Sequence, residues 1–291
     1  MEELLMEDHP IRLPKGSWDC HVHVFDPRFP YQDGRDYTPG PATADTLAQQ
    51  HPNWGVSHPV IVQASVFGTD NSCLLDGLRR LGPTARAVAV VDPRRISDEA
   101  LADLYAGGVR GLRVNLVASG ASISGDPFTL TAARLRGTGM FLQVYAPRAK
   151  ILARRAAIEG AGVPVVLDHF AGGDEVVSLR PMLDSAPVWV KLSADYRLSL
   201  DASHARQIAR QMIAEFHDLI PDRLIWGSDW PHTGGGAERK QRPITQIEPF
   251  RQVDSLSVPA LFDAAGLSAA AQTAILCQNP ERLFDAGSVN I

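Results

Sequence analysis

The sequence of 291 residues lacks long apolar runs and an excess of basic residues. No stretch approaches the roughly 18 apolar residues that a membrane-spanning helix needs, so no membrane association is expected. The acidic N-terminus also lacks the basic region and apolar core of a secretory signal. A net charge of −5 argues against a nucleic-acid partner, because phosphate binding needs a basic surface.

Cysteine is scarce as well. The three cysteines, Cys20, Cys73 and Cys277, have no Cys-x-x-Cys spacing. This argues against a disulfide framework and against a cysteine zinc site, and it favours a reducing, cytoplasmic location. Each cysteine is therefore expected to act only in packing.

The chain does contain many short runs rich in valine and isoleucine. Their near-continuous apolar character is typical of strands buried on both faces. They occupy residues 17–25, 58–66, 86–92, 109–117, 140–146, 163–171, 186–194 and 222–231. Capping residues and glycine stops predict helices between most of them, at 70–82, 97–108, 147–162 and 201–220.

Eight strands that alternate with helices predict an α/β fold, a (β/α)8 TIM-type barrel, as a single domain over residues 17–291. Residues 1–16 are expected to form an N-terminal arm, and residues 27–58 a long irregular loop after the first strand. A doubly wound open sheet is the alternative, and periodicity does not exclude it. No glycine-rich phosphate loop follows the first strand, which weakens the nucleotide-binding form of that alternative.

Two histidines stand one residue apart in the run "DCHVHVFD". On a strand, His21 and His23 point the same way with their Cα atoms about 6.5–7 Å apart. This spacing can place both rings on one metal ion or on one carbonyl oxygen. A hydrogen-bonded structural pair is the alternative.

Polar side chains also follow most of the later strands. Buried without partners, each would cost several kcal/mol, so they must meet each other, a metal or a ligand. In a barrel, the carboxyl ends of the strands gather at one face, where active sites lie. These side chains are Arg113, Asn115, Tyr145, Asp168, His169, Lys191, Ser193, Arg197, Asp229 and His232.

The motifs "HVH", "LDHF" and "WGSDWPH" together resemble the amidohydrolase superfamily, in its branch of 2-pyrone-4,6-dicarboxylate lactonases. The resemblance runs from residue 17 to "NPERLF" at 279–284. It implies that His21, His23, His169 and Asp229 line a hydrolytic site and could bind one divalent metal ion, such as zinc. Because the lactonase branch needs no essential metal, one ion or none is expected. Tyr145 replaces the ligand of two-metal relatives, so a two-metal centre is not implied.

The resemblance also implies residues that bind an anionic substrate. They are Arg113, Arg197, Tyr37 and Tyr145, and His232 would assist catalysis. Asn115, which follows Arg113 on the same strand, is also expected to bind the substrate. From the residues alone, Arg113 could instead pair with a neighbouring acid, and Arg197 could lie at a helix entry. The chain departs from the branch in two places, where it has Ala118 and Ser119 in place of a second arginine, and Gly234 in place of an asparagine.

We therefore expect a hydrolase that opens a small anionic lactone carrying a carboxylate or a sulfonate. Asp229 would be the general base for water, and the histidines, with or without one metal ion, would polarise the carbonyl group. Two alternatives remain within the superfamily, a metal-dependent decarboxylase and a sugar-acid lactone isomerase. A non-catalytic small-molecule-binding protein is a third. No oligomeric state follows from the sequence.

Overall fold

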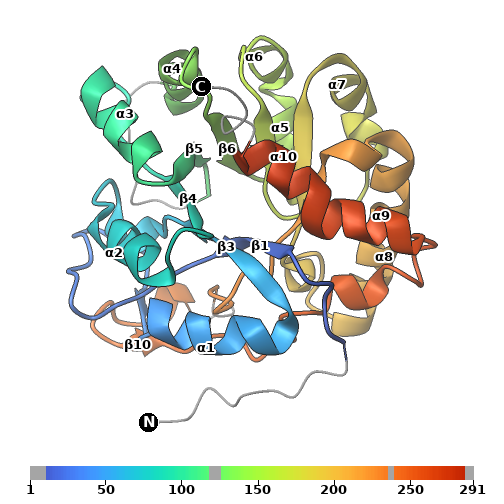
Figure 1. The fold of residues 1–291 in the computed structure, drawn as a ribbon, viewed down its shortest axis with the longest axis horizontal. Helices are drawn as coiled ribbons and strands as arrows, with labels where there is room; N and C mark the ends of the chain where they lie inside the picture. Colours follow the sequence, from blue (N-terminus) through green and yellow to red (C-terminus); the bar gives the residue numbers. More distant parts are fainter. Residues whose placement is uncertain (1–10, 118–125, 235–238, 286–291) are drawn as a thin grey trace.

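The computed structural model describes residues 11–117, 126–234 and 239–285. Within them, eight parallel strands neighbour one another in sequence order, and helices surround them (Figure 1). The strands are β1 (Ser17–Val22), β3 (Val56–Val62), β4 (Arg86–Ala89), β5 (Val109–Asn115), β6 (Phe141–Tyr145), β7 (Val165–Leu167), β8 (Val188–Leu192) and β9 (Leu224–Trp226). The helices are α1 (Ala44–Trp54), α2 (Ser72–Leu81), α3 (Asp98–Ala106), α4 (Pro127–Leu135), α5 (Arg148–Leu152), α6 (Arg155–Glu159), α7 (Arg180–Ser185), α8 (Ala202–Leu219), α9 (Ala269–Thr273) and α10 (Asn279–Asp285).

The last strand meets the first through backbone hydrogen bonds. The N–H of His23 donates to the carbonyl of Trp230 at 2.8 Å, and the N–H of Asp229 donates to the carbonyl of His21 at 2.9 Å. Gly227 allows this approach, because a Cβ atom there would lie 2.6 Å from the Cβ of His21. The predicted (β/α)8 barrel is confirmed, and the open doubly wound sheet is excluded.

An apolar cluster fills the barrel interior. At the amino end of the strands, Phe284 of α10 stacks on Trp18 at a ring distance of 5.4 Å and meets Phe141 edge-on at 5.3 Å. The carboxyl end of the barrel is therefore the end left for polar chemistry. The cluster consists of Trp18, Cys20, Val60, Val62, Val88, Phe141, Val166, Trp189, Ile225 and Phe284.

β1 carries one extra residue between Asp19 and Val22, which pair with Pro59 and Ile61 of β3. Such a bulge resets the alternation of side chains. Cys20 lies in the interior cluster although the next residue, His21, reaches the site above it. The bulge therefore overrides the strand alternation that would otherwise separate these two neighbours onto opposite faces.

Asp19 fixes this bulged strand to its surroundings. Its Oδ1 accepts the N–H of Ser228 at 2.8 Å and the N–H of His21 at 3.2 Å. Its Oδ2 lies 3.3 Å from Nε2 of His51 on α1. The acid at the start of "DCHVHVFD" thus joins β1, the segment after β9, and the first helix.

The prediction of an irregular loop over residues 27–58 is wrong in part, because α1 occupies 44–54. Thr43 caps its amino end by accepting the N–H of Thr46 at 3.2 Å, and Gly55 ends it with a φ of 85°. Pro52 lies inside the helix. Because proline usually ends or kinks a helix, the sequence does not indicate that α1 continues to Trp54.

Residues 11–16 of the expected N-terminal arm lie against the barrel. Leu13 is buried, and its N–H donates to the carbonyl of Trp54 at 2.8 Å. The N–H of Gly16 donates to Ser57 Oγ at 3.2 Å. The domain boundary at residue 17 stays a prediction, although β1 begins there.

The other predicted helices correspond to α2, α3 and α8, and the stretch 147–162 forms two short helices, α5 and α6. Ser97 and Asp201 cap α3 and α8 by accepting the N–H groups of Ala100 and His204. No helix in the described ranges is both long enough and apolar enough to span a membrane.

Candidate active site

Three imidazole rings converge on one carboxylate oxygen at the carboxyl end of the barrel. The Nε2 atoms of His21, His23 and His169 lie 3.6, 3.7 and 3.9 Å from Oδ1 of Asp229. His21 belongs to β1 and His23 directly follows it, whereas His169 and Asp229 lie in the turns after β7 and β9. The side chains of all four are almost wholly buried. The four residues that the motifs predicted to act together are thus in contact range.

The opposite nitrogen of each ring is held by a neighbour. Nδ1 of His23 lies 2.8 Å from the carbonyl oxygen of Val62, which can only accept, so this ring is protonated at Nδ1 and its Nε2 lone pair faces Asp229. Nδ1 of His169 lies 2.8 Å from Ser193 Oγ. Both rings are therefore fixed in orientation before any ligand binds.

The donor set of this cluster fits a single metal ion. Nε2 of His21 and Oδ1 of Asp229 are buried and have no hydrogen-bond partner among the described residues. Ligand atoms bound about 2.1 Å from a tetrahedral zinc ion lie about 3.4 Å from one another, close to the three Nε2–Oδ1 distances. The ligand atoms of His21, His23 and Asp229 all lie within 4.8 Å of one another, and those of His169 form a second such group with His21 and Asp168. Three imidazoles and one carboxylate are also chemically suited to zinc.

Behind His21, a buried ion network holds the ring from its other side. Nζ of Lys191 lies 3.2 Å from Nδ1 of His21, 3.1 Å from Oδ1 of Asp168 and 2.9 Å from Oε1 of Gln143. Oδ2 of Asp168 accepts from Gln143 at 3.0 Å and from Arg113 at 3.2 Å. The sequence placed Asp168 and Lys191 at strand ends but gave them no role, and it gave no signal for Gln143.

Two donors occupy the other oxygen of Asp229. The hydroxyl of Tyr196 donates to Oδ2 at 2.5 Å, and Nη2 of Arg197 donates to it at 3.1 Å. Arg197 also donates to the carbonyl of Thr233 at 2.9 Å. Arg197 thus lies at the site rather than at a surface helix entry. Tyr196 was missed, although its place beside Arg197 after the seventh barrel strand was the available signal.

The protonation states follow from burial and from neighbouring charges. Burial lowers the pKa of His23 to about 4 and that of His169 to about 3. Burial, and next the charge of Lys191, hold the pKa of His21 well below its ordinary value. Burial alone would raise the pKa of Asp229, but His169 and Arg197 outweigh it and hold that pKa well below the ordinary range. Near pH 7 the site therefore combines neutral rings with an ionised carboxylate.

Left-handed backbone conformations mark the same residues. His169 has a φ of 52° and Asp229 a φ of 61°. Residues other than glycine adopt such angles at a cost of about 1–3 kcal/mol, and they concentrate at functional sites. The sharp turns aim both side chains back over the barrel end.

A cavity of about 530 Å³ opens beside this cluster. It is lined by eight of the ten predicted site residues, namely His23, Tyr37, Arg113, Asn115, Tyr145, His169, Arg197 and Asp229. Arg113 therefore pairs with a neighbouring acid and also faces the cavity. Ala118 and Ser119 lie outside the described residues. Gly234 lines the cavity with a φ of 106°, and a Cβ atom there would lie 2.8 Å from Nη1 of Arg197.

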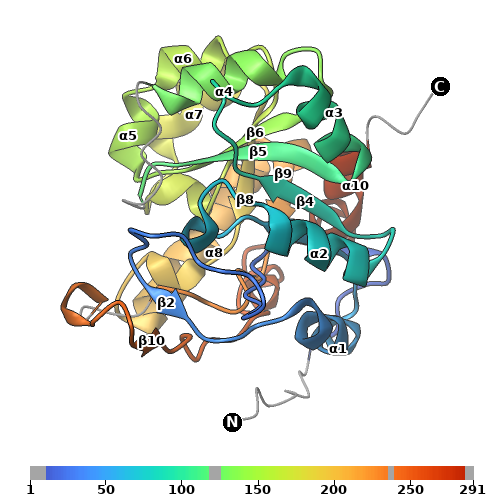
Figure 2. The same ribbon diagram turned by 90° about the vertical axis from the view of Figure 1, so that its left-hand side faces the viewer.

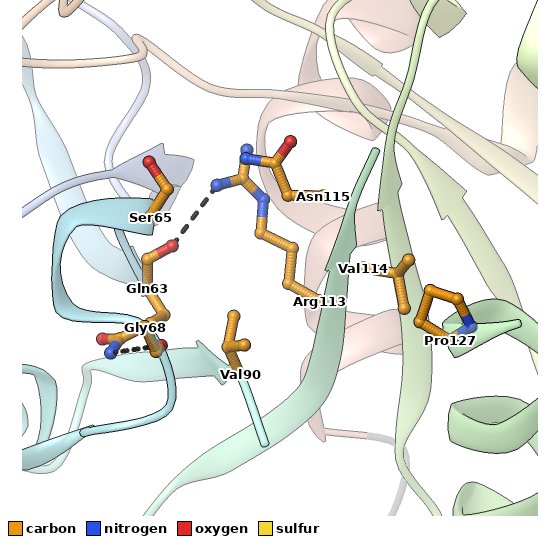
Figure 3. A pocket seen from close by; sticks show the side chains of 8 residues that line it. All are labelled: Gln63, Ser65, Gly68, Val90, Arg113, Val114, Asn115 and Pro127. Atoms are coloured by element: carbon orange, nitrogen blue, oxygen red, sulfur yellow. Dashed lines mark hydrogen bonds between the residues drawn. The ribbon is translucent and has the colours of Figure 1, made fainter. Parts of the chain in front are cut away.

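A second, small cavity of about 20 Å³ adjoins Arg113 and Asn115 (Figure 3). Figure 3 shows the guanidinium group of Arg113 turned toward the backbone carbonyl of Gln63, to which it donates at 3.3 Å. Together with the contact to Asp168, this bond fixes Arg113 in place before a ligand binds.

Two predicted residues lie outside the cavity lining: His21, which belongs to the histidine cluster, and His232, which is buried beside the site. Nε2 of the His232 ring lies 3.3 Å from Ser255 Oγ. The backbone N–H of His232 donates to the backbone carbonyl of Asp229 at 2.8 Å. Burial lowers its pKa to about 4. Through these contacts His232 stabilises the turn that contains Asp229. The expected role of His232 in catalysis stays a prediction.

Comparison with known families decides the relationship that the motifs suggested. The model of the amidohydrolase family matches residues 18–286. The chain belongs to the amidohydrolase family. A 4-sulfomuconolactone hydrolase of Rhizobium radiobacter is 29% identical to this amidohydrolase over 288 residues, covering 94% of this chain and 91% of the relative. A 2-pyrone-4,6-dicarboxylate hydrolase of Comamonas testosteroni is 30% identical over 296 residues, with the same two coverages.

Solved structures show the same barrel. One from Pseudomonas putida, described as a candidate 2-pyrone-4,6-dicarboxylic acid hydrolase, is 29% identical with a TM-score of 0.77, covering 94% of this chain and 98% of the other. An amidohydrolase of Burkholderia multivorans with bound zinc is 20% identical with a TM-score of 0.66, covering 92% and 99%. The similarity to the Burkholderia structure shows only that the two proteins share a fold.

Proposed function

We propose that this amidohydrolase opens a small anionic lactone that carries a carboxylate or a sulfonate group. The observation that carries the proposal is an ionised carboxylate, Asp229, encircled by neutral imidazoles beside a cavity lined by arginines. The relatives named as sulfomuconolactone and pyrone dicarboxylate hydrolases support the same substrate class.

In this proposal Asp229 takes a proton from the water that attacks the ring carbonyl. Its Oδ1 is the free oxygen, because Tyr196 and Arg197 occupy Oδ2. His21 and His169 would stabilise the oxyanion that forms, and a donor in such a place contributes about 3–4 kcal/mol. His23 offers only a lone pair there, because its proton is on Nδ1. Arg113 and Arg197 orient the anionic group of the substrate, since guanidinium forks match carboxylate and sulfonate oxygens.

One divalent ion, such as zinc, would be held by His21, His23 and Asp229, with His169 beside them, and the proposal holds with one ion or with none. When bound, the ion would polarise the carbonyl group and lower the pKa of bound water. The protein residues alone would hold the substrate, aim the carboxylate and exclude bulk water. A cytoplasmic location also remains a prediction, supported by the cysteine pattern.

The direct test compares Asp229→Asn with the wild type on a panel of carboxylated and sulfonated lactones. Loss of the general base should lower kcat by about 10²–10⁴-fold while substrate binding is largely retained. Asp218→Asn, an exposed change on α8, is the matched control and should leave kcat unchanged. Near-normal turnover of Asp229→Asn would reject the proposed base.

The same panel separates the alternatives. A metal-dependent decarboxylase would release carbon dioxide and would lose activity in a chelator. A sugar-acid lactone isomerase would convert a lactone without net hydrolysis. A binding protein would retain lactones without consuming them, so ring opening with uptake of one water per turnover identifies the hydrolase.

A further inference from the structure

Lys191 is a buried charged residue that takes no part in the proposed proton transfer. It belongs to β8, and its side chain is fully buried. Figure 2 shows β8 together with β5 and β6, which carry Arg113 and Gln143, inside the surrounding helices. Because a buried ammonium group is costly without partners, the atoms that it contacts indicate its role.

The ammonium group of Lys191 can only donate hydrogen bonds, because it carries three protons and no lone pair. It donates to Oε1 of Gln143 at 2.9 Å and lies 3.1 Å from Oδ1 of Asp168, so both of these neighbours are acceptors. A third neighbour is Nδ1 of His21, at 3.2 Å. A ring nitrogen that accepts from an ammonium group must offer its lone pair. The proton of the neutral His21 ring is therefore on Nε2.

Asp168 is the other group that could determine which nitrogen of His21 carries the proton. Its Oδ1 lies 3.4 Å from Nδ1 of His21 and would favour a proton on that nitrogen. However, this oxygen makes no hydrogen bond with any residue in the described ranges, whereas the contact between Lys191 and His21 has hydrogen-bond geometry. The geometry therefore favours the lysine as the partner of Nδ1.

The neighbouring histidine has the opposite arrangement. His23 carries its proton on Nδ1, which donates to the carbonyl of Val62 at 2.8 Å. The two rings of "HVH" thus present different groups to Oδ1 of Asp229, a donor from His21 at 3.6 Å and a lone pair from His23 at 3.7 Å. A metal ion needs a lone pair on each nitrogen that it binds. His23 supplies one as it stands, whereas His21 would first have to move its proton to Nδ1, against the ammonium group.

We propose that Lys191 is a positioning residue that holds the proton of His21 on Nε2, so that this ring is a hydrogen-bond donor in the site and a poor ligand for a metal ion. The lysine thereby weakens the affinity of the site for a divalent ion. The inference concerns the site before a substrate binds, so it goes beyond the proposed function and does not depend on it.

Nitrogen-15 NMR of protein labelled in its histidine rings, recorded at pH 7.5 with a chelator, tests the position of the proton directly. A long-range proton–nitrogen correlation spectrum shows which ring nitrogen is protonated, and spectra of His21→Asn and His23→Asn identify the two rings. The wild type should show His21 protonated at Nε2 and His23 protonated at Nδ1. A wild-type His21 ring protonated at Nδ1 would overturn the inference, and this measurement needs no variant of Lys191.

Lys191→Met tests whether the lysine is the cause. The variant leaves Asp168 Oδ1, 3.4 Å away, as the partner of Nδ1, so the proton of His21 should move to Nδ1. Zinc affinity in isothermal titration should then rise about tenfold or more, since outer partners of a metal-binding histidine change metal affinity by about 10–100-fold. Lys15→Met, an equal charge change at an exposed position, should alter neither the tautomer nor the zinc affinity.

Two results with Lys191→Met would overturn the inference. One is a His21 ring that keeps its proton on Nε2, and the other is a zinc affinity equal to or below that of the wild type. A purely structural role of Lys191 would lower the stability without moving the proton. Because both measurements are made without substrate, failure of the lactone assays would refute the proposed function and leave the role of Lys191 standing.

Discussion

The stability of this protein should fall steeply between pH 7 and pH 5, because its site histidines are buried in the neutral form. Their pKa values are about 4 for His23 and His232 and about 3 for His169, against about 6.5 in an unfolded chain. As the pH falls below 6.5, these histidines bind protons in the unfolded chain but stay neutral in the folded protein. Lower pH therefore favours unfolding. At pH 5 each ring lowers the free energy of unfolding by about 2 kcal/mol, and the three together by about 6 kcal/mol.

Urea unfolding followed by circular dichroism, at half-unit steps from pH 7.5 to 5 and in the presence of a chelator, measures this loss. Asp168 and Asp229 have lowered pKa values, and their stabilisation is present above the unfolded value of about 3.9, so they contribute little to the loss in this window. His21 also has a lowered pKa and adds to the loss, so His232→Asn should remove about 2 kcal/mol of it rather than all of it. His204→Asn, at an exposed position, should leave the loss unchanged. A free energy of unfolding that stays flat from pH 7 to 5 would refute the reasoning.

Two further predictions concern residues that were missed from the sequence or given no role there. Lys191→Met leaves Asp168 buried without its ammonium partner and should lower the free energy of unfolding by about 3–5 kcal/mol in urea titrations. Adding Asp168→Asn should recover part of that loss, and simple additivity of the two changes would contradict the pairing. Tyr196→Phe removes a donor from Asp229, so it should raise the pKa of that carboxyl and move the acid limb of the pH–rate profile to higher pH. An acid limb that does not move would show that the Tyr196 contact does not control the carboxyl.

Much of the fold was predictable because each barrel strand is buried on both faces. That requirement leaves a nearly continuous apolar run in the sequence, and all eight runs became barrel strands. The helix α1 was not predicted, because Pro52 lies inside it and its flanks are rich in loop residues. The bulge in β1 was not predictable either, since an extra residue in one strand is defined only by the pairing of its neighbour.

The candidate site, like the fold, could be predicted from the sequence only in part. His21, His23, His169 and Asp229 stand out because a polar residue at the end of a buried strand has few structural reasons to be there. Gln143 and Tyr196 do not stand out, because an amide in an apolar run and a tyrosine in a loop are ordinary residues. Their roles come from the partners that the closed barrel brings within hydrogen-bond distance.

The sequence by itself determined the class of fold, the family resemblance and the four residues at the centre of the site, since these depend on local pattern and on position along each strand. Only the tertiary structure decided which atoms face one another. It placed three Nε2 atoms around one oxygen of Asp229 and a lysine behind His21. Such contacts join residues up to 208 positions apart, as between His21 and Asp229, and closure of the barrel is the physical event that brings them together.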